Sequence, residues 1–190
     1  METEDMAGAK KKARQERRTI VFLDESGLNQ RPHRCRTWAP RGQTPVLQYH
    51  FNWKKLSAVA GLTLWRFYFH LYPGAIRGPE MIDFLKRLRR ALPGRILLIW
   101  DGLAVHRSRL VRDYLASLRG AIHVAYLPPY APELNPVEYI WGYWKQHELP
   151  NLCPDDLVHL SAVGRQALNR MRRRPRLITA FWKQASLFPE

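Results

Sequence analysis

Short apolar runs recur along much of the chain, and two of them end at an aspartate. Residues 19–24 (TIVFLD) are mostly β-branched or aromatic and predict a buried strand that ends at Asp24, before Gly27. Residues 95–101 (RILLIWD) are continuously apolar between Arg95 and Asp101 and predict a strand buried on both faces. Further strands are predicted at 56–64 and 65–72, with a bend near Gly61 or Arg66, and at 122–127, and a turn or edge hairpin is predicted at 37–45.

Apolar residues at helical spacing alternate with the later strands. The segment 78–92 has a proline in its first turn and stops at a Pro-Gly pair, which predicts a helix. Ser108 is a suitable N-cap for a helix to Leu118, and Asn135 for a helix that carries Glu138 in its first turn. The expected inward residues of these two helices are Leu110, Val111, Tyr114, Leu115 and Leu118, and Val137, Ile140, Trp141 and Trp144. Another helix is predicted at 155–171 and a short amphipathic segment at 177–182.

The order of these elements predicts the fold class. Strands first, then strands alternating with helices, indicate an α/β domain with a mixed sheet flanked by helices. The chain of 190 residues is long enough for one sizeable hydrophobic core, expected over residues 19–190 with helices at its C-terminal end. Residues 1–18 carry a basic cluster and no apolar periodicity, and they predict a basic flexible tail.

Charge changes this picture by suggesting a partner. Lys and Arg number 31 against 16 Asp and Glu, so the formal net charge is +15. A field of this sign attracts polyanions, and nucleic acid is the expected partner. On charge alone, a solvated basic surface, an acidic protein and a membrane surface stay open as alternatives.

Cysteine content and hydropathy bear on the compartment. Cys35 and Cys153 are the only cysteines, and their spacing indicates neither a disulfide framework nor a zinc site. No apolar run approaches the ~20 residues needed to cross a bilayer, and the N-terminal residues are charged rather than signal-like. We therefore expect a cytoplasmic, nucleoid-associated protein without membrane association.

The aspartates at the two strand ends are candidate metal ligands. Because the carboxyl ends of neighbouring strands meet at one sheet edge, Asp24 and Asp101 are expected to be neighbours. Two carboxylates within ~4–6 Å repel one another unless a cation compensates, and Mg²⁺ or Mn²⁺ suits oxygen ligands. Glu138 would complete a site for two ions about 3.5–4 Å apart that perform phosphoryl transfer. Each acid is also explained as a strand-end turn former or a complement to the helix dipole, and spacing does not decide.

Basic and aromatic residues near these acids are candidates for DNA contacts. His106 either lies over the scissile phosphate or has a structural role near a helix cap. Trp141 and Trp144 share one helix face, which favours core packing over stacking on a flipped base. The candidate phosphate contacts, each with solvated surface as the alternative, are Arg87, Arg90, Arg107, Arg109 and Lys145.

Four segments together resemble a known family. Residues 127–138 (LPPYAPELNPVE), followed by Trp141, are similar to the motif around the third acid of mariner-related insertion-sequence transposases. Residues 22–26 (FLDES) and 101–106 (DGLAVH) resemble the family's segments around the first and second acids. Residues 36–42 (RTWAPRG) also resemble a segment of the family. These segments occur in family order over most of the chain that is expected to fold.

The resemblance implies a ribonuclease-H-like fold and a metal-binding triad of Asp24, Asp101 and Glu138. Thirty-six residues lie between Asp101 and Glu138, close to the spacing of the family's short-spaced members. Glu25 and Glu133 are nearby acids outside the motif positions. They are therefore weaker candidates for the triad.

The resemblance also implies a function and partners. It implies Mg²⁺- or Mn²⁺-dependent cleavage and strand transfer of double-stranded DNA, at transposon ends and target, by a DDE transposase. The alternatives are a ribonuclease-H-like nuclease that never joins strands and an inactive, domesticated DNA-binding domain. About eighteen residues precede the first predicted strand, so the family's N-terminal helix-turn-helix region is expected as a separate or fused unit, and a homodimer is an option. Gly102 stands where family members often carry asparagine, so hydrogen bonding beside the second acid is expected to differ.

Overall fold

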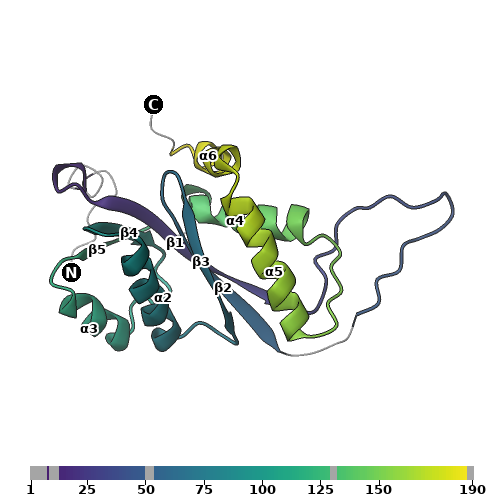
Figure 1. Cartoon of the computed structure of the whole chain (residues 1–190), viewed down its shortest axis with the longest axis horizontal. Coiled ribbons are helices and arrows are strands. Elements are labelled where there is room, and N and C mark those ends of the chain that lie inside the picture. The colour runs from purple at the N-terminus through teal and green to yellow at the C-terminus, as the bar shows by residue number, and fades with distance from the viewer. Residues whose placement is uncertain (1–7, 9–12, 50–53, 129–131, 188–190) are drawn as a thin grey trace.

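The computed structural model describes residue 8 and residues 13–49, 54–128 and 132–187. A sheet of five strands in the order β3-β2-β1-β4-β5 runs through the domain (Figure 1). β1 pairs antiparallel with β2 and parallel with β4, so the sheet is mixed, as predicted. The strands are β1 (Thr19–Asn29), β2 (Lys55–Leu62), β3 (Phe67–Pro73), β4 (Ile96–Trp100) and β5 (Ile122–Tyr126).

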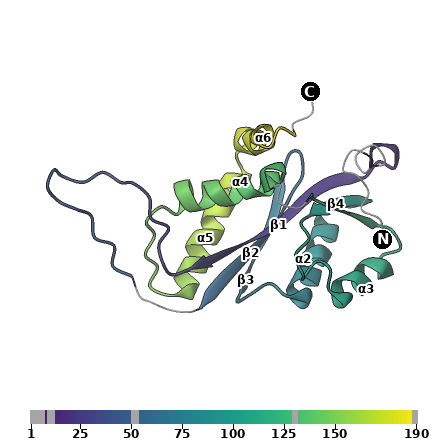
Figure 2. The ribbon, with the colours of Figure 1, turned by 180° about the vertical axis from the view of Figure 1, so that it is seen from behind.

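Helices cover both faces of the sheet, with a separate apolar core on each side (Figures 1 and 2). One face carries α2 (Gly78–Ala91) and α3 (Arg109–Ser117). The other carries α4 (Pro136–Tyr143), α5 (Leu157–Arg172) and α6 (Pro175–Gln184). A 3-10 turn (Pro132–Leu134) precedes α4, and a π-helical turn (Trp144–Glu148) continues it. The side chains of Ser108 and Asn135 cap α3 and α4, because each accepts a hydrogen bond from a first-turn backbone N–H.

β1 is longer than its apolar run predicted. The prediction that it ends at Asp24 is wrong, because residues 22–29 pair with the whole length of β2 and the strand continues to Asn29. Gly27, expected to end the strand, lies inside this ladder. Only residues 19–22 pair with β4. Among the described strands, β1 therefore runs on without a partner on its β4 side, and Asp24 lies at this opening.

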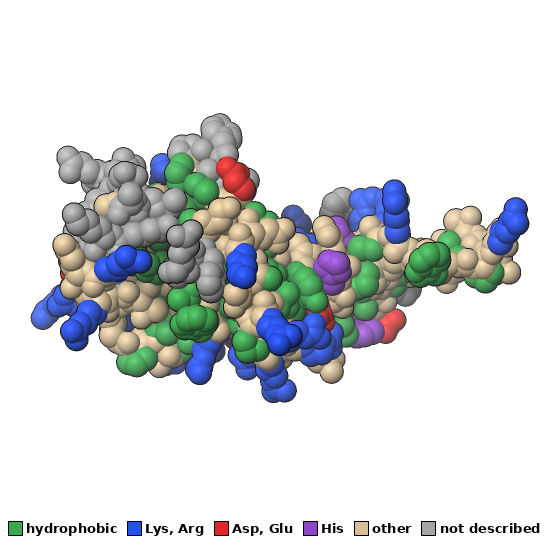
Figure 3. Space-filling model, turned by 90° about the horizontal axis from the view of Figure 1, so that it is seen from above, with side chains coloured by type: hydrophobic (Ala, Val, Ile, Leu, Met, Phe, Trp, Pro, Cys, Tyr) green, Lys and Arg blue, Asp and Glu red, His purple; other side chains and the backbone are tan. Residues whose placement is uncertain are grey.

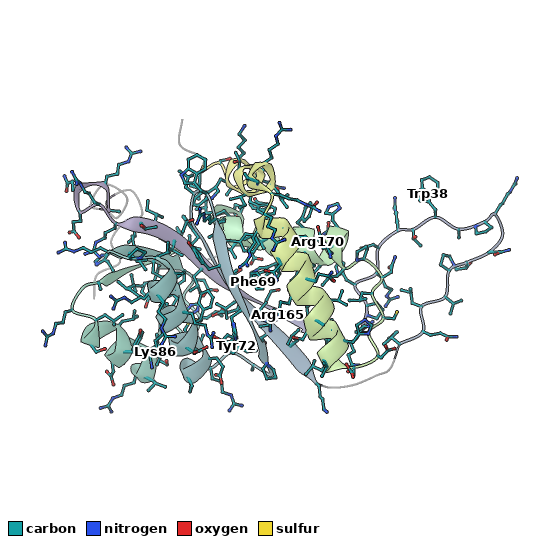
Figure 4. All side chains as sticks on the ribbon, in the orientation of Figure 1. Trp38, Phe69, Tyr72, Lys86, Arg165 and Arg170 are labelled. Atoms are coloured by element: carbon teal, nitrogen blue, oxygen red, sulfur yellow. The ribbon has the colours of Figure 1, made fainter. Side chains whose placement is uncertain are left out.

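Residues 30–49, which follow β1, project from the domain as a long arm (Figures 1 and 2). The turn predicted within residues 37–45 is present, since the N–H of Gln43 donates to the carbonyl oxygen of Pro40 at 3.0 Å and Gly42 has a φ of 82°. No strand pairing occurs in residues 37–45, so the alternative of an edge hairpin is wrong. Trp38 is fully exposed on this arm (Figure 4).

The inner face predicted for the helix after Asn135 is buried, whereas the face predicted for α3 is mostly only partly buried. All four residues predicted on the inner face of the helix after Asn135 are buried. On α3 only Val111 is fully buried, and the other predicted inward residues Tyr114, Leu115 and Leu118 are partly buried. Leu110 is 52% exposed, because it lies beside Gly78 at the start of α2 rather than under the sheet. Among the helices of the described residues, none is long and apolar enough to cross a bilayer.

Part of the segment assigned to a flexible tail is packed against the domain. In residues 13–18, Ala13 is buried, and the guanidinium of Arg18 donates to the carbonyl oxygens of Ile96 and Gly120. These contacts secure the chain directly before β1. For residues 1–7 and 9–12 the prediction lies outside the described residues.

Candidate active site

The opening between β1 and β4 brings two aspartates to one edge of the sheet. Phe22 and Ile99 form the last pair of the parallel β1–β4 ladder. Asp24 and Asp101 each lie two residues beyond that pair, at the carboxyl edge of β4. This is the arrangement that the two apolar runs led us to expect.

Asp24 is almost completely buried, with 6% of its surface exposed. Its side chain points toward α4, where the indole Nε1 of Trp141 donates to Asp24 Oδ2 at 3.0 Å. Burial, followed by the negative charges of Glu138, Glu25 and Asp101, raises the pKa of Asp24 to about 8. A carboxyl group that is ordinarily ionised at neutral pH is therefore held close to its titration point by its surroundings.

Glu138 lies in the first turn of α4, close enough for its charge to act on Asp24. Burial raises the pKa of Glu138, the positive charge of Lys145 opposes the rise, and Asp101 adds to it. Lys145, about two turns further along, donates from Nζ to Oγ of Ser26 at 2.7 Å. Burial lowers the pKa of Lys145 against the attraction of Glu138 and Asp24. A single lysine thus lies among several acids and does not neutralise them all.

Asp101 is held by the loop that follows β4. Its Oδ1 accepts the backbone N–H of Leu103 at 3.0 Å and lies 2.8 Å from Nδ1 of His106. Burial acts to raise the pKa of Asp101, but the hydrogen bonds from His106 and Leu103 outweigh it and lower the pKa. Oδ2 of Asp101 accepts no hydrogen bond from the described residues. It is the oxygen that this loop leaves available for a ligand.

His106 is fully buried between two acids. Its Nε2 lies 2.8 Å from Oε1 of Glu25, and its ring stacks on Trp100 with centroids 4.1 Å apart and planes 4° apart. Burial acts to lower the pKa of His106, but the bonds to Asp101 and Glu25 prevail and raise it to about 9. His106 is therefore a protonated link between the acids. In this arrangement it has no surface with which to contact a phosphate, which corresponds to the structural alternative.

Two of the five basic residues considered as phosphate contacts lie at this edge. Lys145 lies beside Glu138, and Arg107 follows directly after His106. The guanidinium of Arg107 lies over the ring of Tyr126, 5.3 Å from its centroid. Tyr126 is the last residue of β5, so Arg107 lies at the carboxyl edge of the sheet.

The other three lie on the outer faces of α2 and α3. Arg87 pairs with Asp83 at 2.7 Å, and Arg109 lies 3.6 Å from Asp113. Arg90 is exposed. Within the described residues, no interaction connects these three arginines with the acids at the sheet edge.

The donor set suits a divalent cation. Carboxylate oxygens from three separate elements are the ligands that Mg²⁺ and Mn²⁺ prefer. No three His, Cys, Asp or Glu side chains of the described residues lie together as an already formed metal site. Burial and, after it, the charges of neighbouring acids raise the pKa of Asp24, and a bound cation would favour its ionised form, so Asp24, Asp101 and Glu138 fit such an ion. Glu133 is exposed on the 3-10 turn, and no interaction joins it to these acids in the described part of the chain.

Sequence reasoning missed the contributions of Glu25 and Trp141. Glu25 follows Asp24 on a strand, so alternation turns its side chain to the opposite face, where it meets His106. Core packing was favoured for Trp141 over stacking on a flipped base, and Trp141 is buried, but its N–H also donates to Asp24. Its position three residues after Glu138 places both on one side of α4 and was the available signal.

Solved structures with the same fold include several of the Mos1 transposase. The Mos1 transposase paired-end complex with left transposon end matches with a TM-score of 0.65 and 19% identity, over 94% of this chain and 55% of that chain. The Mos1 mariner paired end complex with Mn matches with a TM-score of 0.63 and 22% identity, over 93% and 55%. The catalytic domain of Mos1 mariner transposase matches with a TM-score of 0.63 and 19% identity, over 94% and 82%. At these identities the likeness shows the fold, which is the ribonuclease-H-like fold that was predicted.

The present chain spans about half the length of the Mos1 chains in the paired-end complexes, 55% of each. No curated protein is similar to it in sequence. The family model described as DDE superfamily endonuclease matches residues 19–157, well over half of the chain. This match confirms the kind of family predicted from the motifs: the chain belongs to the DDE superfamily of endonucleases.

Proposed function

We propose that this domain cleaves and joins DNA phosphodiesters as the catalytic part of a DDE transposase, with Asp24, Asp101 and Glu138 holding two Mg²⁺ or Mn²⁺ ions. The observation that carries the proposal is the buried Asp24, whose pKa is raised to about 8 by burial and by three neighbouring acids. Folding has gathered like charges at one sheet edge, and divalent cations would offset their repulsion. When bound, such ions activate the attacking oxygen and stabilise the leaving oxygen of the phosphodiester.

The side chains around the acids have positioning roles in this proposal. His106 holds Oδ1 of Asp101 and leaves Oδ2 free, and Glu25 fixes His106 from its other nitrogen. Trp141 fixes one oxygen of Asp24. Because these bonds exist before DNA binds, little reorganisation is needed when the reaction begins.

DNA is the proposed substrate. The net charge of +15 favours a polyanion, and Figure 3 shows a face on which Lys and Arg are frequent and Asp and Glu are scarce. Lys145 and Arg107 are the proposed phosphate contacts, since they lie at the edge that carries the acids. The Mos1 structures with transposon-end DNA support DNA ends as the substrate class.

Recognition of a particular DNA end is proposed to come from outside this domain. As the motif resemblance implies, a helix-turn-helix unit, separate or fused, would supply sequence recognition. We also propose that two copies of the chain act together and hold two DNA ends.

A nicking assay tests the metal assignment. The domain, alone and fused to an upstream DNA-binding domain, is incubated with plasmid DNA and Mn²⁺. Asp101→Asn and Glu138→Gln should lose nicking, whereas the matched control Glu133→Gln, an exposed acid near the same helix, should retain it. Nicking by Asp101→Asn at the wild-type rate would overturn the assignment.

A joining assay separates the proposed transposase from a nuclease. A precut duplex with a free 3′ hydroxyl is offered together with target plasmid, and joined products are expected. Cleavage without joining would indicate a ribonuclease-H-like nuclease. If metal changes neither thermal stability nor DNA affinity, the chain is a DNA-binding domain without catalysis.

A further inference from the structure

The loop after β4 contains a glycine whose missing side chain leaves room for an arginine. A Cβ added at Gly102 would lie 2.7 Å from Nη2 and 3.3 Å from Cζ of Arg107. The first distance is too short for a real contact, so any larger residue at this position would displace the guanidinium. Gly102 does not have a positive φ, so backbone strain does not account for a glycine here.

The same guanidinium rests on an aromatic ring. Cζ of Arg107 lies 5.3 Å from the centroid of the Tyr126 ring, within the range of a cation–π contact. Tyr126 pairs with Trp100, and these residues end β5 and β4. Arg107 is thus held between Gly102 and Tyr126 at the edge of the sheet that carries Asp101.

Among the described residues, no acid pairs with the charge of Arg107. Arg107 is exposed and forms no ion pair with an acid in the described residues. Arg109, in contrast, lies 3.6 Å from Asp113, and Arg87 lies 2.7 Å from Asp83. An oriented and unpaired guanidinium suits a phosphate, because its planar set of N–H donors matches two phosphate oxygens.

We propose that Arg107 binds a phosphate of the DNA strand that enters the active site. Glycine is required at position 102 because a side chain there would displace the guanidinium of Arg107. The proposal rests on the DNA-cleaving function proposed above. A phosphate contact positions the strand relative to Asp101 without reading its sequence. The ring of Tyr126 restricts the guanidinium in advance, so less conformational freedom is lost when DNA binds.

DNA binding at several salt concentrations tests the contact without requiring cleavage. The domain is titrated onto a fluorescent duplex in Ca²⁺, whose flexible coordination suits binding better than catalysis. Loss of one phosphate contact lowers affinity roughly tenfold near 0.1 M salt. The decrease of log affinity with log salt also becomes shallower, by about one in slope. Arg107→Ala should show both changes. Arg95→Ala removes an exposed arginine directly before β4, at the opposite edge of the sheet, and should show neither.

Substitution of Gly102 tests the second half of the proposal. Gly102→Ala should lose as much affinity as Arg107→Ala yet melt close to the wild type, because only the far end of a flexible side chain must move. The double variant should bind like Arg107→Ala alone, since both changes remove one contact. Arg107→Lys keeps the charge without the planar donors and should recover part of the affinity.

Three outcomes decide between the explanations. Equal losses for Arg107→Ala and Arg95→Ala would overturn the proposal, because general surface charge would then explain both. Additive losses in the double variant would overturn the role of Gly102. A domain that shows the expected affinity differences but never cleaves DNA would support the phosphate site and contradict the proposed function, so the two failures are distinguishable.

Discussion

β1 carries two adjacent acids that lie on opposite faces of the sheet in different surroundings. Glu25 faces the side of α2 and α3, where His106 lies 2.8 Å from its carboxylate. Asp24 faces α4, where burial and Glu138 dominate and its pKa is raised to about 8 despite the nearby Lys145. The protein neutralises the charge on the first face and leaves the second face short of positive charge.

This difference indicates that one face of β1 holds the geometry of the site and the other takes part in the reaction. Groups whose charges are satisfied inside the protein hold a fixed geometry, as His106 does for Asp101. Groups held in unfavourable electrostatic surroundings reduce stability, and they are typical of sites that a ligand completes. We therefore expect substitutions on the Asp24 face to act on the reaction, and those on the Glu25 face to act on the support.

Asp24→Asn should cause the largest loss of activity. Asparagine keeps the shape and the acceptor for Trp141 but loses the charge that would hold the metal. Loss of several kcal/mol of transition-state stabilisation corresponds to a rate decrease of roughly 10³-fold or more. Glu25→Gln should lose less, because its charge acts through His106. Single-turnover nicking at saturating Mn²⁺ measures both, and equal losses would remove the distinction between the faces.

The same Asp24→Asn substitution should stabilise the metal-free domain, and increasingly so as the pH rises. In the folded wild type Asp24 keeps its proton up to a pKa of about 8, whereas the unfolded chain releases it near 3.8. Between these values the folded state binds the additional proton, so the wild-type free energy of unfolding falls as the pH rises. At about 1.4 kcal/mol per pKa unit, the total is on the order of several kcal/mol.

Urea unfolding in EDTA at pH 5 and at pH 8 measures this effect. The gain in free energy of unfolding from Asp24→Asn should be larger at pH 8, because the asparagine does not titrate. Comparison with the wild type cancels the titration of other groups, including His106. A gain that is the same at both pH values would contradict the raised pKa of Asp24.

Mn²⁺ should restore the stability that the Asp24 face lacks. A ligand that binds only the folded state stabilises it by about 2.7 kcal/mol at a concentration of 100 times its Kd. The thermal midpoint of the wild type should therefore rise by several degrees with Mn²⁺ and fall again with EDTA, and Asp24→Asn should respond weakly. The rise should need less Mn²⁺ at pH 8 than at pH 6, because Asp24 must release its proton. A wild-type midpoint that ignores Mn²⁺ would contradict the metal site.

The elements that carry the acids were predictable because their signals are local. Two apolar runs that end in Asp24 and Asp101 identify strands, and Asn135 followed by proline identifies the helix start that places Glu138 in a first turn. These patterns involve residues close together in sequence, so they can be recognised without knowledge of the tertiary structure. The assignment of the triad itself rested on motif resemblance.

The surroundings of the acids were not predictable because they depend on long-range pairing. β1 continues past Asp24 only because β2, which begins at Lys55, pairs with it, and this continuation places Glu25 on the opposite face. The burial of His106 depends in turn on Glu25 and on stacking against Trp100. The space that Arg107 occupies beside the loop is likewise a property of the folded chain.

His106→Gln should test the support on the Glu25 face. Glutamine is neutral and cannot bond both Asp101 and Glu25 with the geometry of an imidazolium. Loss of such a supporting residue commonly lowers metal affinity or activity about 10–100-fold. The Mn²⁺ concentration for half-maximal nicking should rise accordingly. His70→Gln, on β3, should leave that concentration unchanged, because within the described residues His70 does not contact the acids of the site. A variant of His106 that melts earlier with an unchanged Mn²⁺ requirement would reduce its role to stability.

Trp141→Phe should have the smallest effect, and Trp144 offers a matched control. Both indoles are buried, with ring centroids 5.7 Å apart, and each donates one hydrogen bond, Trp141 to Asp24 at 3.0 Å and Trp144 to the carbonyl oxygen of Gly164 at 3.1 Å. Each Phe variant should lose about 1 kcal/mol of stability. Only Trp141→Phe releases an oxygen of Asp24, so only it should change the Mn²⁺ requirement, by roughly fivefold. Equal changes in both variants would mean that α4 has loosened as a whole, whereas a change confined to Trp141→Phe would mean that its indole positions Asp24 as well as filling the core.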